Sequence, residues 1–129
     1  PMLTEYLVDG SPLGLSSQLR VDAVGEAGVV VEVKYGLGPS RRHAAALAGY
    51  ALALEAEAEA PVDYGVLVYV NGVPRGEPRL RVEPVYIGPR LREEFLRLRD
   101  EAIDTLLQGE PPRATGCSEA CPFYTACWG

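Results

Sequence analysis

Apolar and polar residues follow a strand-like pattern in five short segments of the chain. β-Branched and aromatic residues dominate these segments, and clusters of glycine, proline and serine separate them. The run VVVEVKY is the clearest case, because it is rich in valine and bounded by glycines. Since only short turns separate the first three segments, we expect them to form an antiparallel meander. The predicted strands are 3–9, 17–24, 29–35, 62–70 and 79–87.

Two longer segments have the period of an α-helix. Ser40 can cap the first, which runs to about residue 59. Residues at steps of four, three and four form an apolar stripe that we expect to face the sheet: His43, Leu47, Tyr50 and Leu54. Three glutamates near the end of this helix predict a frayed, solvated terminus: Glu55, Glu57 and Glu59.

The second helix is predicted at 89–108, opened by Pro89 and ended by Gly109. Its apolar stripe consists of Leu91, Phe95, Leu98, Ala102 and Leu106. The intervening charges alternate in sign, which favours a salt-bridged face in solvent made of Arg90, Arg92, Arg97 and Arg99 with Glu93, Glu94, Asp100 and Glu101.

These elements predict an α/β domain with a mixed, mainly antiparallel sheet, flanking helices and a C-terminal tail. At 129 residues, of which 47% are hydrophobic, the chain suits one domain with one core. We divide it into a core at 1–110 and a cysteine-bearing tail at 111–129. No apolar run approaches the ~20 residues that cross a bilayer, and the first residues lack the pattern of a secretion signal. The sequence thus predicts a cytoplasmic protein with no membrane partner.

The charge balance is acidic, with a formal net charge of −6. It argues against a broad nucleic-acid-binding surface but leaves room for a local basic track beside an acidic metal site. Of the 12 Lys and Arg residues, Lys34 is the only lysine. Abundant Ala, Arg and Glu with few Asn and Gln residues would suit a heat-adapted organism.

Asp22, Glu32 and Lys34 form the chemically most informative group. Alternate residues of a strand share a face, so Glu32 and Lys34 point the same way, and a short connection brings Asp22 beside them. Two carboxylates and the backbone carbonyl of Val33 make an oxygen-rich site of the kind that Mg²⁺ or Mn²⁺ prefers. Such an ion activates water for phosphodiester hydrolysis, and the Lys34 ammonium would stabilise the developing charge. The alternative is an ordinary Glu–Lys pair on an exposed sheet face.

All three cysteines lie in the tail, as Cys117, Cys121 and Cys127. An odd number of cysteines does not suit a disulfide framework, and their clustering is typical of loops that bind an iron–sulfur cluster or zinc. Three thiolates leave a four-coordinate site one ligand short. The fourth ligand would be exogenous, come from a partner, or be absent from this chain.

Four residues of the first predicted helix allow two interpretations each. For His43 we favour a packed, hydrogen-bonded core residue over a contact with substrate or active site. The ring of Tyr50 fills core, while its hydroxyl can reach the site. Arg41 and Arg42 are either DNA phosphate contacts near the site or members of a solvated turn.

Taken in order, three stretches of the chain resemble the RecB-like CRISPR-associated exonucleases that carry an iron–sulfur cluster, with the archaeal type I-A branch the most similar. The resemblance covers nearly the whole chain from about residue 13. It rests on Arg20-Val21-Asp22 before Val31-Glu32-Val33-Lys34-Tyr35, on the helical segment from His43 to Glu55, and on Cys117-x3-Cys121-Pro-Phe-Tyr-x2-Cys127.

This resemblance implies a restriction-endonuclease-like fold of the PD-(D/E)xK superfamily. It implies that Asp22 and Glu32 bind metal, that Lys34 is the catalytic lysine, and that Tyr50 is the tyrosine of the following helix. The three cysteines would hold a 4Fe–4S cluster with a fourth, N-terminal cysteine. The implied activity is the trimming of DNA ends, single-stranded or with single-stranded tails, before new spacers enter a CRISPR array. Other adaptation proteins would be partners, and an oligomer is compatible.

The chain departs from the family pattern in two respects. Ala46 stands where the family has a glutamine, four residues before the tyrosine. The family's N-terminal helix, metal-ligating histidine and fourth cysteine have no counterpart in residues 1–12, which predicts a fragment or a reduced variant. A metal-dependent DNA exonuclease is the first hypothesis. The rivals are a truncated or degenerate core that binds DNA or protein without cutting, and a small zinc-bound nucleic-acid module.

Overall fold

The computed structural model describes residues 1–36, 38–72, 76–111, 113 and 115–128. They fall into two compact units, Pro1–Arg97 and Leu98–Gly129. The boundary between the units lies inside the second long helix, and the functional division at residue 110 remains a prediction.

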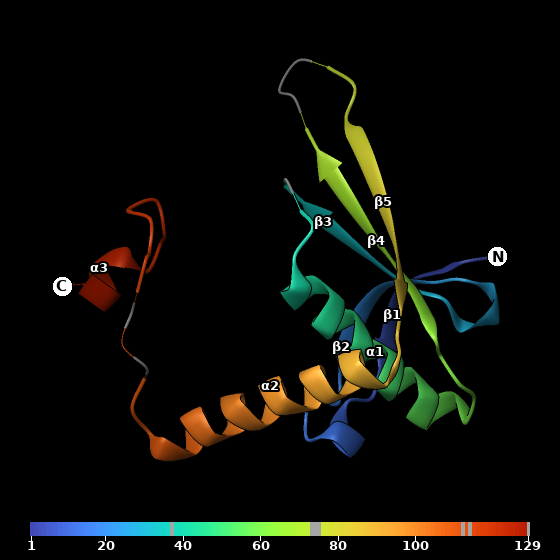
Figure 1. The fold of residues 1–129 in the computed structure, drawn as a ribbon, viewed down its shortest axis with the longest axis horizontal. Coiled ribbons are helices and arrows are strands. Elements are labelled where there is room, and N and C mark those ends of the chain that lie inside the picture. Colours follow the sequence, from blue (N-terminus) through green and yellow to red (C-terminus); the bar gives the residue numbers. More distant parts are fainter. Residues whose placement is uncertain (37, 73–75, 112, 114, 129) are drawn as a thin grey trace. The chain divides into compact units, whose positions relative to one another are not determined.

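The first unit is built on a five-stranded sheet in the order β1-β2-β3-β4-β5 (Figure 1). The first three strands form the predicted antiparallel meander, β3 and β4 run parallel, and β4 and β5 are antiparallel. The α/β class and the mixed, mainly antiparallel sheet are therefore confirmed. The strands are β1 (Leu3–Val8), β2 (Leu19–Val24), β3 (Val30–Tyr35), β4 (Tyr64–Asn71) and β5 (Arg79–Tyr86), with short 3-10 turns at Ser11–Leu13 and Glu26–Gly28.

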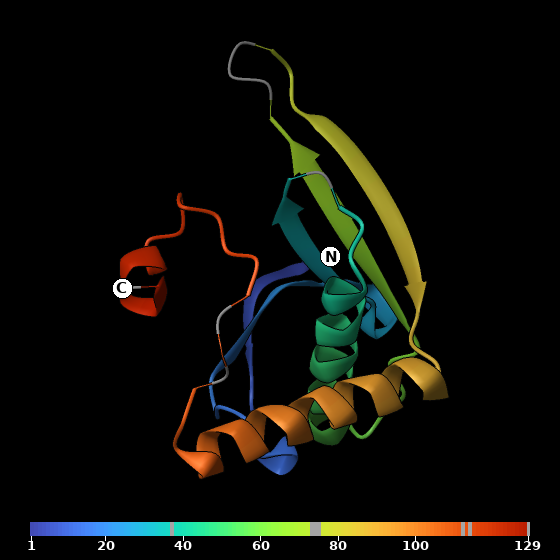
Figure 2. The same ribbon diagram turned by 60° about the vertical axis from the view of Figure 1, so that its left-hand side comes forward.

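Helix α1 (Arg41–Ala58) makes the crossover that the parallel pair β3 and β4 requires, and it lies on one face of the sheet (Figures 1 and 2). Its predicted cap is present, because the Ser40 side chain accepts a hydrogen bond from the Arg42 amide at 3.2 Å. Leu47 and Leu54 are buried in a core with Leu67 of β4, while the other members of the predicted stripe are partly buried. The predicted inner face of this helix is confirmed.

Helix α2 (Pro89–Gln108) has the predicted bounds. In its first half, Leu91 and Phe95 pack against the core of the first unit. Gly49 of α1 permits this contact, since a Cβ at that position would lie 2.5 Å from Cε2 of Phe95. The two helices are thereby held in close contact next to Tyr50, which is half-buried one residue further along α1.

Two sequence predictions about these helices are wrong. Glu55 is not part of a solvated end, and Arg92 is not on a solvent face: their side chains are 23% and 20% exposed. The Arg92 guanidinium donates to both carboxylate oxygens of Glu55, each at 2.7 Å. Position 92 lies three residues before Phe95, on the inner side of α2. The charge pattern alone does not reveal which arginine of the helix turns inward.

The second unit contains the last part of α2 and a short helix, α3 (Tyr124–Trp128), which the sequence did not predict. None of its described residues is fully buried, and Leu106 and Leu107 are each 80% exposed. Across the described residues of the chain, no helix has the length and apolar character needed to cross a membrane.

Candidate metal and catalytic site

The site forms where the ladder between β2 and β3 ends. The two strands pair at Ala23–Val31 and Val24–Val30. Beyond these pairs, the strands are joined by hydrogen bonds between main-chain amides and the carboxylates of Asp22 and Glu32. The Asp22 amide donates to Oε1 of Glu32 at 3.3 Å, and the Val33 amide donates to Oδ2 of Asp22 at 2.7 Å. Each carboxylate is thus fixed by a main-chain donor, and both lie in the opening between the strands.

Glu32 is the one charged side chain that is buried among the described residues, at 3% exposure. Its ion-pair partner is Lys34, whose Nζ lies 3.5 Å from Oε2 and whose side chain is 36% exposed. Burial raises the pKa of Glu32, and the nearby negative charge of Asp22 raises it further, whereas the Asp22 amide and the Lys34 ammonium oppose the shift. The single ammonium of Lys34 does not fully offset the negative charges of Glu32 and Asp22, so a further cation beside these two carboxylates would be stabilising.

The donor set suits a hard divalent cation such as Mg²⁺ or Mn²⁺. In a β-strand the N–H and C=O of one residue project to the same side. Since the Val33 amide reaches Asp22, the Val33 carbonyl faces the same opening and adds a third oxygen. No group of three His, Cys, Asp or Glu side chains gathers anywhere in the described residues, so a bound ion would complete its shell with water.

Tyr50 of α1 lies within electrostatic range of these carboxylates. Burial raises the pKa of its hydroxyl, and the charges of Glu32 and Asp22 raise it further, which puts the hydroxyl in the field of both. One turn earlier, Ala46 is exposed and lines a cavity of about 170 Å³ together with Tyr50. The small side chain therefore leaves open space at the position where the resembling family has a glutamine.

Tyr69 of β4 is a site neighbour that the sequence reasoning missed. It pairs with Lys34 across β3 and β4 and is 2% exposed. Its hydroxyl accepts a hydrogen bond from the Ser40 amide at 3.1 Å and lies 2.9 Å from Nδ1 of His43. His43 thus has the hydrogen-bonding partner that the structural interpretation expects, but its ring is only partly buried, and its role stays a prediction. The alternation of residues along β4 could have predicted this position, because it puts Tyr69 on the same buried face as Leu67.

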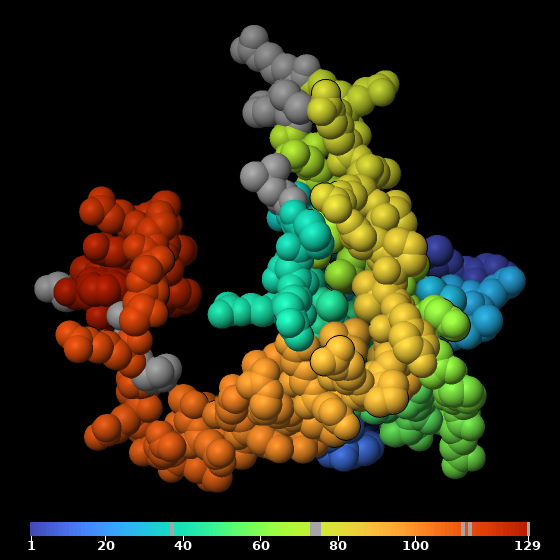
Figure 3. Space-filling view, viewed as in Figure 1, coloured from blue at the N-terminus to red at the C-terminus, as the bar shows by residue number. Residues whose placement is uncertain are grey.

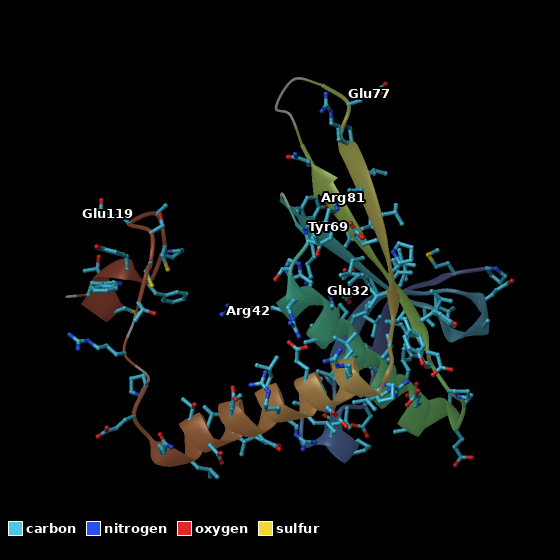
Figure 4. All side chains as sticks on the ribbon, in the orientation of Figure 1. Glu32, Arg42, Tyr69, Glu77, Arg81 and Glu119 are labelled. Atoms are coloured by element: carbon cyan, nitrogen blue, oxygen red, sulfur yellow. The ribbon has the colours of Figure 1, made fainter. Side chains whose placement is uncertain are left out.

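The two arginines at the start of α1 differ in their surroundings. The guanidinium of Arg41 is bound to the carboxylate of Glu94 at 2.7 Å. Arg42 is exposed and makes no ion pair with another described residue. Of the two predicted phosphate contacts, Arg42 is the one whose charge is available; Figure 4 shows its side chain extending from α1.

Comparison with known proteins assigns the chain to a family. All of residues 1–129 match the family of CRISPR-associated exonuclease Csa1. The chain belongs to the Csa1 family. It is 43% identical over 129 residues to CRISPR-associated exonuclease Csa1 of Thermoproteus tenax and 41% identical to that of Saccharolobus solfataricus. Each match covers 98% of this chain, but only 44% and 43% of the relatives, so this Csa1-family chain spans less than half of their length.

The fold of this Csa1-family chain also has a relative among solved structures. The crystal structure of SSO0001 matches it with a TM-score of 0.55 and 23% sequence identity. The match covers 84% of this chain and 48% of the other. At this level of identity the likeness concerns the fold alone, and it agrees with the α/β architecture of the first unit.

The cysteines of this Csa1-family chain lie in the second unit, and all three are free thiols. Cys117 and Cys127 are exposed, and Cys121 is partly exposed. Their thiols suit an iron–sulfur cluster or zinc chemically, but the described residues contain no gathered set of three such ligands. The cluster therefore remains a prediction that depends on the tail folding around it.

Proposed function

We propose that this chain is the core of a metal-dependent DNA exonuclease whose active site is Asp22, Glu32 and Lys34. The observation that carries the proposal is the buried Glu32 carboxylate, which adjoins Asp22 and has the Lys34 ammonium 3.5 Å away. Two neighbouring carboxylates with a single lysine beside them match what hydrolysis of a phosphodiester requires. The names of the Csa1 relatives support a nuclease as the reaction class.

In this proposal each residue has a separate task. Asp22, Glu32 and the Val33 carbonyl would hold Mg²⁺ or Mn²⁺, which when bound neutralises phosphate oxygens and makes water acidic. The Val33 amide fixes the Asp22 carboxylate. The Lys34 ammonium would stabilise the negative charge that grows on the phosphate as water attacks phosphorus. Tyr50 would orient substrate or water beside the carboxylates.

The finer role we propose is the trimming of DNA ends before spacer integration in CRISPR adaptation. The order of the sequence motifs and the names of the relatives support it. Other adaptation proteins would then be partners. Cys117, Cys121 and Cys127 would bind a 4Fe–4S cluster, with the fourth ligand from outside this chain. A broad absorbance near roughly 400 nm, with iron rather than zinc by elemental analysis, would support the cluster.

The nuclease proposal is tested with Mn²⁺ and end-labelled single-stranded DNA. We expect degradation that Lys34→Ala reduces by at least about 10²-fold, because a group that stabilises transition-state charge is lost. Arg90→Ala is a matched control, because it removes an exposed arginine at the start of α2, outside the sheet that carries the site. Equal activity of wild type and Lys34→Ala would refute the assignment.

A second candidate is a non-catalytic module that binds DNA or adaptation proteins. Ala46 favours it, because this small side chain leaves open space where the resembling family has a glutamine. Calorimetry separates the two candidates, since a degenerate core need not bind Mn²⁺. Heat of Mn²⁺ binding by wild type that is lost in Glu32→Ala supports the catalytic site, whereas no binding by either protein supports the module.

A further inference from the structure

The face of the sheet that α1 covers carries its functional residues in parallel rows across three strands. Residues paired between neighbouring strands share a face. One row is Glu32, Leu67 and Glu83; the next is Lys34, Tyr69 and Arg81; the last contains Asn71 and Arg79. The charge on this face therefore changes from acidic at Glu32 to basic toward the end of the β4–β5 hairpin.

Figure 4 shows this succession: Glu32, Tyr69 and Arg81 follow one another toward the end of the hairpin. The hairpin extends past the end of β3 (Figure 1), and the atoms of β5 are open to solvent along the strand (Figure 3). A cavity of about 320 Å³ lies on this stretch and is lined by Gly36, Tyr69, Asn71, Arg79, Leu80 and Arg81. Lys34 and Arg81 flank Tyr69 on either side, which puts their backbones about 10 Å apart, at two strand spacings.

The positive charge on this stretch is available to a ligand. Arg79 is exposed and has no ion pair within the described residues. Arg81 is 60% exposed and is paired with Glu83, two residues further along the same strand, at 2.6 Å. By contrast, Arg92 and Arg41 are held by carboxylates of α1 and α2. One cavity beside the site is lined by two arginines and an asparagine. This local positive charge contrasts with the net charge of −6 of the whole chain.

We propose that Arg79, Arg81 and Asn71 bind the backbone of a single DNA strand next to the phosphate that is cut at Lys34. The two guanidinium groups would bind neighbouring phosphates, and the Asn71 amide would contact sugar or base. The volume of the cavity is that of a small-molecule site, which suits one nucleotide of a single strand rather than a duplex. This assignment rests on the proposed nuclease function and extends it to the β4–β5 hairpin as the guide for the strand.

The test measures binding without cleavage. Fluorescence anisotropy of a labelled 20-nucleotide oligothymidine is recorded in EDTA over a series of salt concentrations, for wild type and for Arg79→Ala/Arg81→Ala. We expect the double variant to weaken binding about tenfold. The slope of log affinity against log salt should shrink by about 1.4, since two phosphate contacts on a single strand are lost. Arg90→Ala, which removes an exposed arginine from the start of α2 rather than from the sheet, should leave both unchanged.

Glu83→Gln is expected to have the opposite effect, because it releases Arg81 from its carboxylate. Binding should become about two- to fivefold tighter, the equivalent of one surface ion pair. Wild-type slopes in the double variant, tighter binding of a duplex than of the single strand, or no DNA binding by wild type would overturn the assignment. If cleavage depends on Lys34 but the double variant binds DNA as well as wild type, only the present inference is refuted. Arginine-dependent binding without cleavage sinks the nuclease proposal alone.

Discussion

Glu32 and Glu55 are both withdrawn from solvent and both face a cation, yet their electrostatics are opposite. The carboxylate of Glu55 receives both arms of the Arg92 guanidinium at 2.7 Å and the Val62 amide at 2.8 Å. The hydrogen bonds from Arg92 lower its pKa, against a smaller opposing effect of burial. Glu32 has one ammonium at 3.5 Å and a second carboxylate beside it, and burial raises its pKa.

The difference distinguishes an ion pair that is satisfied within the fold from a candidate site that can accept a cation. Arg92 satisfies Glu55 completely and connects the end of α1 to the start of α2. Glu32 and Asp22 keep an excess of negative charge that the fold does not neutralise. Such uncompensated charge costs stability and is retained where a cation or a substrate supplies the missing partner.

Activity should separate the two glutamates most strongly. Glu32→Gln removes one negative ligand of the proposed metal site, and we expect cleavage of labelled DNA with Mn²⁺ to fall by at least about 10²-fold. Glu55→Gln leaves the site residues in place, so its rate at a temperature where it is folded should stay within about twofold of wild type. Similar losses in both variants would mean that Glu32 acts through the fold and not through the reaction.

Stability should separate them in the reverse order. Arg92→Met leaves Glu55 without its partner, and we expect the free energy of unfolding in urea to fall by about 2 kcal/mol. This loss is smaller than that for breaking a fully buried ion pair, because both side chains of the pair are partly exposed. Glu32→Gln removes an uncompensated charge and should cause no loss without metal. The combination of Arg92→Met with Glu55→Gln should cost less than the two single losses together. Additive losses would contradict a direct coupling of the pair.

The sequence predicted that Asp22, Glu32 and Lys34 lie together because the geometry of this candidate site is local. Alternation along β3 puts Glu32 and Lys34 on one face, and the short turn after β2 brings Asp22 alongside. The ion pair of Glu55 with Arg92 joins residues that are 37 positions apart. It depends on how α1 and α2 cross, which is set by a contact such as Gly49 with Phe95 and leaves no periodic signal.

Register limits the rest of the sequence prediction in the same way. That 79–87 forms a strand follows from its pattern. The position of Arg81 beside Tyr69, in the row that also contains Lys34, depends on one particular alignment of β4 and β5. The cysteine tail shows a different limit. The spacing of its cysteines predicts a cofactor. The described residues do not gather three possible ligands in one place, so the positions of the three thiols around a cofactor do not follow from the chain alone.

The smallest expected effect is a pair of opposite pH dependences. The pKa of Glu32 is raised above its ordinary value of 4.5, so its contribution to stability is complete below pH 4.5 and is lost as pH rises through the folded-state value. The pKa of Glu55 is lowered, so its contribution is present above pH 4.5 and is lost as pH falls through the folded-state value. Each slope is limited to about 1.4 kcal/mol per pH unit.

Urea unfolding of wild type, Glu32→Gln and Glu55→Gln between about pH 3 and pH 7 measures both slopes. Relative to wild type, Glu32→Gln should gain stability as pH rises above 4.5, because only the wild type then buries a charge. The deficit of Glu55→Gln should shrink as pH falls below 4.5, because the wild-type carboxylate then becomes neutral as well. Slopes of the same sign in the two variants would mean that Glu32 is neutralised within the fold as fully as Glu55. The case for a cation that binds the Asp22–Glu32 pair would then fail.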